Sequence, residues 1–136
     1  MRRSLKYRLA GVCLLLTLTI SACSLTQPPF VRMVDGAGGT FSAAATTLSY
    51  FHQGKLSRAY TISSFASYES QLDGLDRQLP AQQGADNQAT VKRLLALYKP
   101  AMQVVQRPCL ESSCDWRGQV TTLEQASRAF VEVGEA

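Results

Sequence analysis

Apolar residues recur at steps of three and four positions through most of the chain from Phe41 onward. This spacing places them on one face of an α-helix, whereas a half-buried strand would alternate apolar and polar positions. The first stretch of this pattern extends to Leu79, and Gly54 either divides it into two helices or weakens one long helix. Its apolar face consists of Phe41, Ala44, Leu48, Phe51, Leu56, Ala59, Ile62, Phe65, Leu72, Leu75 and Leu79.

A second stretch of helical spacing lies between a loop at residues 80–84 and Pro108. Asp86 or Asn87 is suited to cap the start of this helix. Pro100 lies inside the pattern and removes one backbone donor, which predicts a kink near residues 96–100. The apolar face of this helix consists of Val91, Leu94, Leu95, Tyr98, Met102 and Val105.

A last helix is predicted near the C-terminus, with Val120, Leu123, Ser127 and Phe130 on its inner face. Asp115 or Thr121 is its candidate N-cap, and Thr121 together with Glu124 fits a capping box. Because the connections between the predicted helices are short, neighbouring helices should run antiparallel. Residues 40–136 are therefore predicted to form an all-α domain, a small antiparallel bundle of three helices, or of four if Gly54 divides the first stretch.

The first 22 residues have a different composition from the rest of the chain. Four basic residues and no acidic one lie within positions 1–8, and residues 9–22 contain only apolar, Gly, Ser, Thr and Cys residues. As a helix this apolar run would span about 21 Å. That length is short of the roughly 30 Å of a bilayer core. The run is typical of the core of a signal peptide.

The run ends in Ile20-Ser21-Ala22-Cys23, which resembles the lipobox of bacterial lipoprotein precursors. The resemblance covers only the leader, and Ile20 stands where Leu is commoner. It implies cleavage before Cys23, a diacylglyceryl thioether on the Cys23 sulfur and often an acyl chain, such as palmitate, on the new amino group. The alternatives are an ordinary secretory signal, for which bulky Ile20 is a poor residue three positions before the cut, and an uncleaved anchor.

The segment that would follow the cleavage site is rich in Pro and Gly, with Pro28-Pro29 and Gly36-Ala37-Gly38-Gly39. We therefore divide the chain into a signal peptide (1–22), a lipidated N-terminus with a flexible tether (23–39) and the helical domain (40–136). Thr40 is the candidate N-cap of the first helix. The apolar residues 30–34 either pack on the domain or lie near the membrane surface.

The leader accounts for the whole net charge of the chain. The full sequence has 14 basic and 10 acidic residues, and the leader holds four of the basic ones, which leaves ten of each sign after cleavage. The net formal charge of +4 therefore argues for insertion of a signal peptide and against binding of nucleic acid.

Cys109 and Cys114 are the two thiols that would remain beside the lipidated Cys23. An even pair in an oxidising compartment predicts a disulfide. Closing so short a loop is worth roughly 2 kcal/mol in the chain-entropy description. Free thiols, or a redox or metal pair, are the alternatives. The four intervening residues are more than the two of common redox motifs.

Three groups of residues have side chains or spacings that could carry chemistry, but none forms the pattern of a catalytic, metal or cofactor site. Gly36-x-Gly38-Gly39-Thr40 lacks the Lys of a phosphate-binding loop. His52, the only histidine, has no nucleophile motif nearby. Glu69, Asp73 and Asp76 share one helical face and either bind a cation or form a solvated charged face, in which Arg77 pairs with Asp73.

Aromatic residues crowd the first helical stretch and either fill the core or line a groove for a ligand or partner. They are Phe41, Tyr50, Phe51, Tyr60, Phe65 and Tyr68. Trp116 either packs over the disulfide turn or forms an exposed hot spot for binding. We take Trp116, Phe51 and Tyr50 as the candidate contacts with a partner or ligand.

These observations predict a lipoprotein without enzymatic activity, anchored to a membrane through lipid on Cys23, that binds an envelope protein or supports an envelope assembly. The alternative is a helical carrier of a small apolar ligand or lipid. The location expected is the cell envelope. If the cell is Gram-negative, the resemblance to lipoproteins of such cells implies the periplasmic face of the outer membrane, because Ser24 and not Asp follows the cysteine.

The lipidation of Cys23 is tested by the intact mass of the mature protein. We expect an N-terminus at residue 23 carrying a lipid-sized mass, and we expect the Cys23→Ala variant to lose both the added mass and the cleavage. A mature wild-type chain without added mass would contradict the lipobox interpretation.

Overall fold

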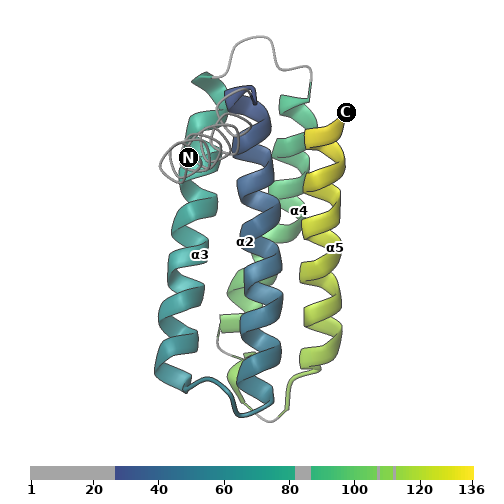
Figure 1. The fold of residues 1–136 in the computed structure, drawn as a ribbon. Coiled ribbons are helices and arrows are strands. Elements are labelled where there is room, and N and C mark those ends of the chain that lie inside the picture. The colour runs from purple at the N-terminus through teal and green to yellow at the C-terminus, as the bar shows by residue number, and fades with distance from the viewer. Residues whose placement is uncertain (1–26, 82–86, 107, 112) are drawn as a thin grey trace, which may run out of the picture.

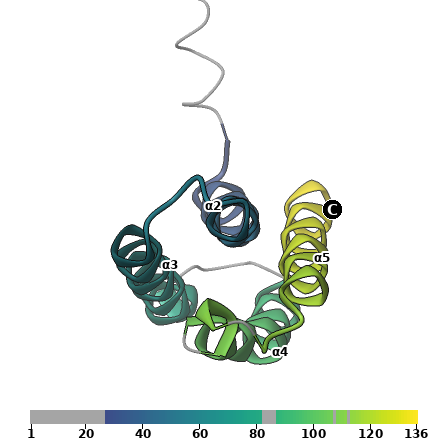
Figure 2. The ribbon, with the colours of Figure 1, turned by 90° about the horizontal axis from the view of Figure 1, so that it is seen from below.

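The structure is a computed structural model, and it describes residues 27–81, 87–106, 108–111 and 113–136. The described residues form four α-helices and two short 3-10 helices: α2 (Pro29–His52), α3 (Arg58–Gln78), η1 (Leu79–Ala81), α4 (Gln88–Gln106), η2 (Pro108–Leu110) and α5 (Trp116–Glu135). The helices run alternately up and down, as Figure 1 shows. Seen end-on in Figure 2, they surround a common interior in which α2 packs against α3 and α5, and α4 packs against the same two helices. The prediction of an all-α antiparallel bundle is confirmed, with four helices.

Gly54 separates α2 from α3, so the first stretch of helical spacing forms two helices and not one long helix. Gly54 has a positive φ of 73°, which costs little for a residue without a Cβ. The amide of Gly54 donates to the Phe51 carbonyl, and the amide of Lys55 donates to the Tyr50 carbonyl. This pair of bonds is a Schellman motif, the common way of ending a helix at a left-handed glycine.

The interior is filled by apolar side chains from all four helices. The rings of Phe41 and Phe130 stack with their centroids 5.4 Å apart, and Tyr98 approaches Phe41 edge-on at 6.2 Å. The largest fully buried side chains are Phe41, Leu48, Phe65, Leu72, Leu79, Met102, Leu123 and Phe130. Most of these positions lie on the predicted apolar faces, so the periodicity located the core.

The prediction that residues 23–39 form a flexible tether is wrong from Pro29 onward. Helix α2 begins at Pro29, a favourable residue for a first helical turn, and it includes Gly36 to Gly39. Val34, Ala37 and Gly38 are buried, and Phe30 and Met33 pack against the core. Burial of this face compensates for the low helix propensity of glycine.

Thr40 is likewise not an N-cap but lies in the middle of α2. Its hydroxyl is 2.9 Å from the Gly36 carbonyl oxygen and 3.2 Å from Oε1 of Gln71 on α3. The phosphate-loop pattern that ends at this threonine is therefore ordinary helix.

Two smaller expectations about α3 and α5 are also corrected. Ala59 and Ile62 are exposed, because α3 starts afresh at its N-cap Ser57 and buries Thr61. Asp115 caps α5 by accepting a hydrogen bond from the Gly118 amide at 3.1 Å. Thr121 lies inside α5 and donates to the Arg117 carbonyl, so the capping box at Thr121 is wrong.

Asn87 immediately precedes α4, whereas the other candidate cap, Asp86, lies outside the described residues. Pro100 lies inside α4, which continues to Gln106 just before the 3-10 turn at Pro108.

At Gly38, α2 packs tightly against α5. A Cβ at this position would lie 3.2 Å from the Ser127 carbonyl oxygen and 3.3 Å from Cγ2 of Val131. The neighbouring Gly39 has open space around the same point. The lack of a side chain at Gly38 therefore allows the two helix backbones to pack against each other.

The two adjacent glycines give a matched test of this packing. Gly38→Leu should destabilise the bundle by about 2 kcal/mol, because the side chain would force α5 away. Gly39→Ala should stabilise it by about 1 kcal/mol through helix propensity alone. Urea unfolding followed by circular dichroism measures both values. Near-zero changes in both variants would instead indicate that these glycines belong to an unstructured tether.

Candidate functional site

The three predicted contact residues lie in two different places. Tyr50 faces a groove between α2 and α3, whereas Phe51 and Trp116 meet around His52 at the end of the bundle that carries the cysteines. Adjacent residues of a helix point about 100° apart. Tyr50 and Phe51 therefore cannot share one surface.

The groove between α2 and α3, here called the tyrosine groove, has a volume of about 570 Å³ and uncharged lining residues. Its lining consists of Gly39, Ser42, Ala43, Thr46, Thr47, Tyr50, Leu56, Tyr60 and Tyr68. Small residues of α2 form one wall, and the tyrosines stand around it. Tyr50 is 43% exposed and Tyr60 is 57% exposed, so their rings remain accessible.

Two contacts hold the tyrosines in place around the groove. The Tyr68 hydroxyl is 2.9 Å from the Thr47 hydroxyl on the facing helix, and this bond joins α2 to α3. The Lys55 ammonium lies over the Tyr50 ring, 4.7 Å from its centroid. A cation in this position is attracted by the negative face of the ring. The groove thus has a neutral wall and one basic end.

The second surface feature is a cluster of side chains at the end of the bundle where α2 stops, here called the disulfide end. Cys109 and Cys114 are paired there as a disulfide, with their Cα atoms 4.8 Å apart. His52, the last residue of α2, contacts the Cys109 carbonyl oxygen through Nε2 at 2.7 Å. Since a carbonyl only accepts, Nε2 carries the proton and donates.

Trp116 completes the disulfide end. Its ring stacks on His52 with a centroid separation of 4.8 Å and an interplanar angle of 5°. The Arg117 guanidinium lies 5.0 Å from the Trp116 ring, and Phe51 meets His52 edge-on at 5.2 Å. These contacts tie the end of α2 to the turn that precedes α5. His52 therefore has a structural role here, as the link between α2 and the disulfide.

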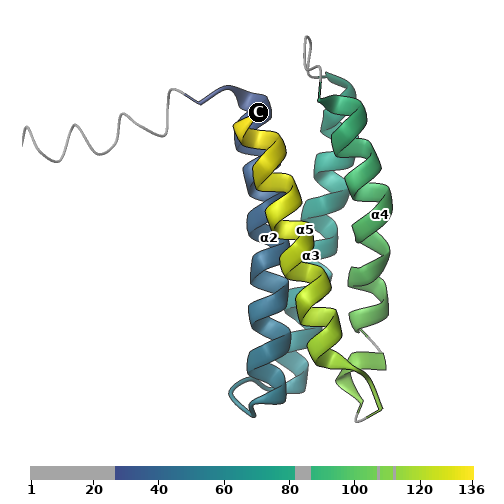
Figure 3. The same cartoon turned by 90° about the vertical axis from the view of Figure 1, so that its right-hand side faces the viewer.

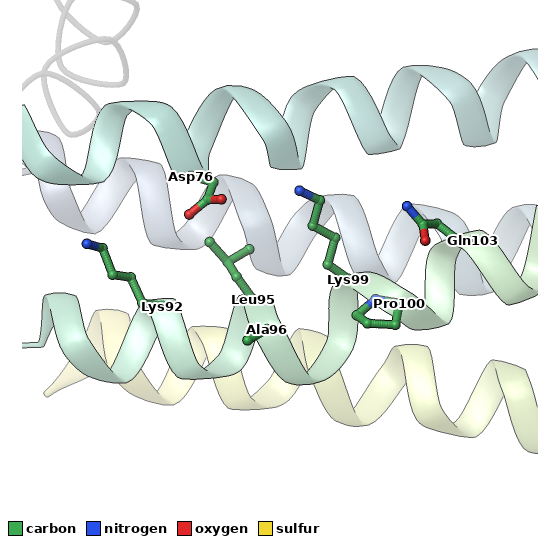
Figure 4. A pocket seen from close by; sticks show the side chains of 7 residues that line it. All are labelled: Asp76, Lys92, Leu95, Ala96, Lys99, Pro100 and Gln103. Atoms are coloured by element: carbon green, nitrogen blue, oxygen red, sulfur yellow. The ribbon is translucent and has the colours of Figure 1, made fainter.

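A second hollow, of about 440 Å³, lies along α3 and α4, and Figure 4 shows its lining residues. Asp76 comes from α3, whereas Lys92 and Lys99 come from α4, so both signs of charge border the hollow. Lys99 forms an ion pair with Asp73 across the two helices. The sequence suggested Arg77 as the partner of Asp73, but the structure pairs Asp73 with Lys99.

The ion pair changes the titration of Lys99. The hydrogen bond to Asp73 raises the pKa of Lys99 above its ordinary value, partial burial opposes this, and the charges of Asp76 and Glu69 add to the increase. Because both partners remain partly exposed, such a pair contributes about 0–1 kcal/mol. Among the described residues no three acidic, histidine or cysteine side chains are placed to bind a metal ion.

Sequence reasoning did not place Tyr60 in one groove with Tyr50, and it missed the stacking of His52 on Trp116. Gly54 indicated the first arrangement, because a turn at this glycine places residues before it, such as Tyr50, near residues after it, such as Tyr60. The second joins residues far apart in the sequence and had no local signal. Cys23 lies outside the described residues, so its lipidation stays a prediction. No helix in the described part of the chain is long and apolar enough to cross a bilayer.

Two substitutions of His52 separate its hydrogen bond from its ring contact. His52→Ala loses both and should cost about 2 kcal/mol, whereas His52→Phe keeps the stacking on Trp116 and should cost about 1 kcal/mol. Urea unfolding followed by circular dichroism gives the two values. Equal costs would show that the stacking contributes nothing, and no cost in either variant would refute the structural role of His52.

Comparison with known protein families, with curated proteins and with solved structures found no match to this chain. The function is therefore inferred from the residues of the leader, the tyrosine groove and the disulfide end.

Proposed function

We propose that the chain is a lipid-anchored helical module of a bacterial cell envelope that binds a partner protein through the tyrosine groove and catalyses no reaction. Two independent features support this proposal. The leader ends in the lipobox-like sequence Ile20 to Cys23, which supports the anchor. The groove supports the binding of a partner.

The observation that carries the partner-binding proposal is the exposure of Tyr50 and Tyr60 beside a wall of small residues. Tyrosine offers a large, rigid contact area at low entropic cost and is enriched in protein interfaces. The small residues Gly39, Ala43 and Thr46 recur at helical spacing, so the backbone of a partner can approach α2 closely. These features suit a helix whose apolar side chains lie in the groove.

The charges around the groove specify the partner further. The lining residues are uncharged, so the partner helix should present an uncharged face to them. Lys55 lies over Tyr50, and Arg58 begins α3 close to Leu56, which also lines the groove. An acidic residue at one end of the partner helix would complement this basic end.

The carrier of a small apolar ligand remains the alternative, and the interior of the bundle gives it less support. A carrier needs a cavity between its helices, and pockets of this kind bury most of a ligand's surface. The described interior is occupied by large side chains, including Phe41, Phe65 and Phe130, each with no exposed surface. A partner on the outer surface suits this packing better than a ligand inside.

Photo-crosslinking in living cells tests the proposal. A crosslinking amino acid at Thr46, which lines the groove, should trap one envelope protein that mass spectrometry identifies. The same amino acid at Leu97, which is 63% exposed on α4, is the matched control and should not trap it. Adding Tyr60→Ala to the Thr46 variant should reduce the yield several-fold.

Three outcomes would count against partner binding. Equal crosslinking from Thr46 and Leu97 would show that the groove is not the interface. No crosslink from either position in membranes that retain the protein would remove the support for a partner. An adduct of lipid mass at Thr46 would favour the carrier alternative.

A further inference from the structure

The start of α2 limits how far the bundle can lie from a membrane. Six residue steps separate Cys23, the proposed lipidation site, from Pro29, the first residue of α2. Fully extended, six residues span at most about 20 Å. The Pro29 end of α2 therefore stays within about 20 Å of the lipid that holds Cys23.

The bundle is longer than this tether. Helix α2 has 24 residues, which corresponds to a length of about 36 Å. It runs from Pro29 at one end of the bundle to His52 at the disulfide end. Helix α5 runs back from Trp116 and ends beside the start of α2, as Figures 1 and 3 show.

These two lengths exclude an inverted bundle. If the disulfide end contacted the lipid, Pro29 would stand about 36 Å above the surface. The six-residue tether reaches about 20 Å, so Cys23 would be pulled out of the membrane.

Outside the tyrosine groove, which we assign to the partner, the described sides of the bundle carry scattered large apolar side chains. The exposed apolar residues are distributed over all four helices: Tyr50 on α2, Tyr60 and Ile62 on α3, Leu97 and Val104 on α4, and Val131 on α5. Along α3 and α4, Asp73 is paired with Lys99, and Asp76 borders a hollow with Lys92, so this side of the bundle carries charges of both signs. Burying these charged groups in lipid would cost their hydration.

We propose that the bundle stands on the lipid surface with its Pro29 end, so that the disulfide end is the part farthest from the membrane. This inference rests on the proposed lipidation of Cys23. Tyr50 lies 21 residues after Pro29, about 32 Å along α2, so the Tyr50 end of the tyrosine groove lies well away from the lipid. A partner can therefore reach the groove from the side facing away from the membrane.

Energy transfer from tryptophan to labelled lipid tests this orientation. Trp116 is the only tryptophan of the chain and lies at the disulfide end, so it serves as the distal donor without any substitution. The proximal donor is Gln78→Trp, at the end of α3 beside the start of α2, combined with Trp116→Phe. Both proteins are extracted in lipidated form and reconstituted into vesicles that contain a dansyl-labelled lipid.

We expect transfer from position 78 to be several-fold stronger than transfer from Trp116. Insertion of a linker of about twelve Gly and Ser residues before Pro28 should reduce this difference, because the longer tether no longer restricts the bundle. Circular dichroism of each variant establishes that the helices are retained.

The possible failures can be told apart. Equal transfer from the two positions in vesicle-bound protein would mean that the bundle lies on its side, and stronger transfer from Trp116 would mean that it is inverted; either overturns the orientation. A difference unchanged by the linker would show that the tether does not set it. Protein that lacks lipid and does not bind vesicles would overturn the anchor itself.

Discussion

The close packing of α2 against α5 is the interaction on which the rest of the structure depends. At Gly38 the two backbones approach so closely that even a Cβ would be crowded by the Ser127 carbonyl. One turn further along, the rings of Phe41 and Phe130 stack in the core. This contact makes the glycine-containing residues from Pro29 to Gly39 helical, which lengthens the bundle and shortens the chain between its end and Cys23.

Helical periodicity was enough to predict the fold class, because the buried positions of an antiparallel bundle repeat every three or four residues. It failed where local composition and tertiary packing disagree. Gly36, Gly38 and Gly39 favour a flexible chain when considered alone, since glycine has a low helix propensity. Residues 29–39 become helical because they pack against the facing surface of α5. The sequence of residues 29–39 alone contains no information about that surface. Thr40 was misassigned as a cap for the same reason.

The candidate site was predictable to a smaller extent. Aromatic composition singled out Tyr50, Phe51 and Trp116 as candidate contacts, but it could not show that they belong to two surfaces. Tyr50 and Phe51 point in different directions from α2 because successive residues of a helix are rotated by about 100°. The turn at Gly54 then places Tyr60 along the same groove as Tyr50. The stacking of His52 on Trp116 joins residues 64 positions apart in the sequence. Contacts of this kind depend on the whole arrangement of helices.

The disulfide end and the tyrosine groove are linked through the last turn of α2. His52 holds this turn to the Cys109 carbonyl and to the Trp116 ring, while Tyr50, two residues earlier, forms part of the groove. The Schellman turn that follows fixes the start of α3 and with it Tyr60. Contacts at the disulfide end therefore limit the movement of both walls of the groove. A binding surface on rigid elements loses less entropy when a partner is bound, because its side chains are already ordered.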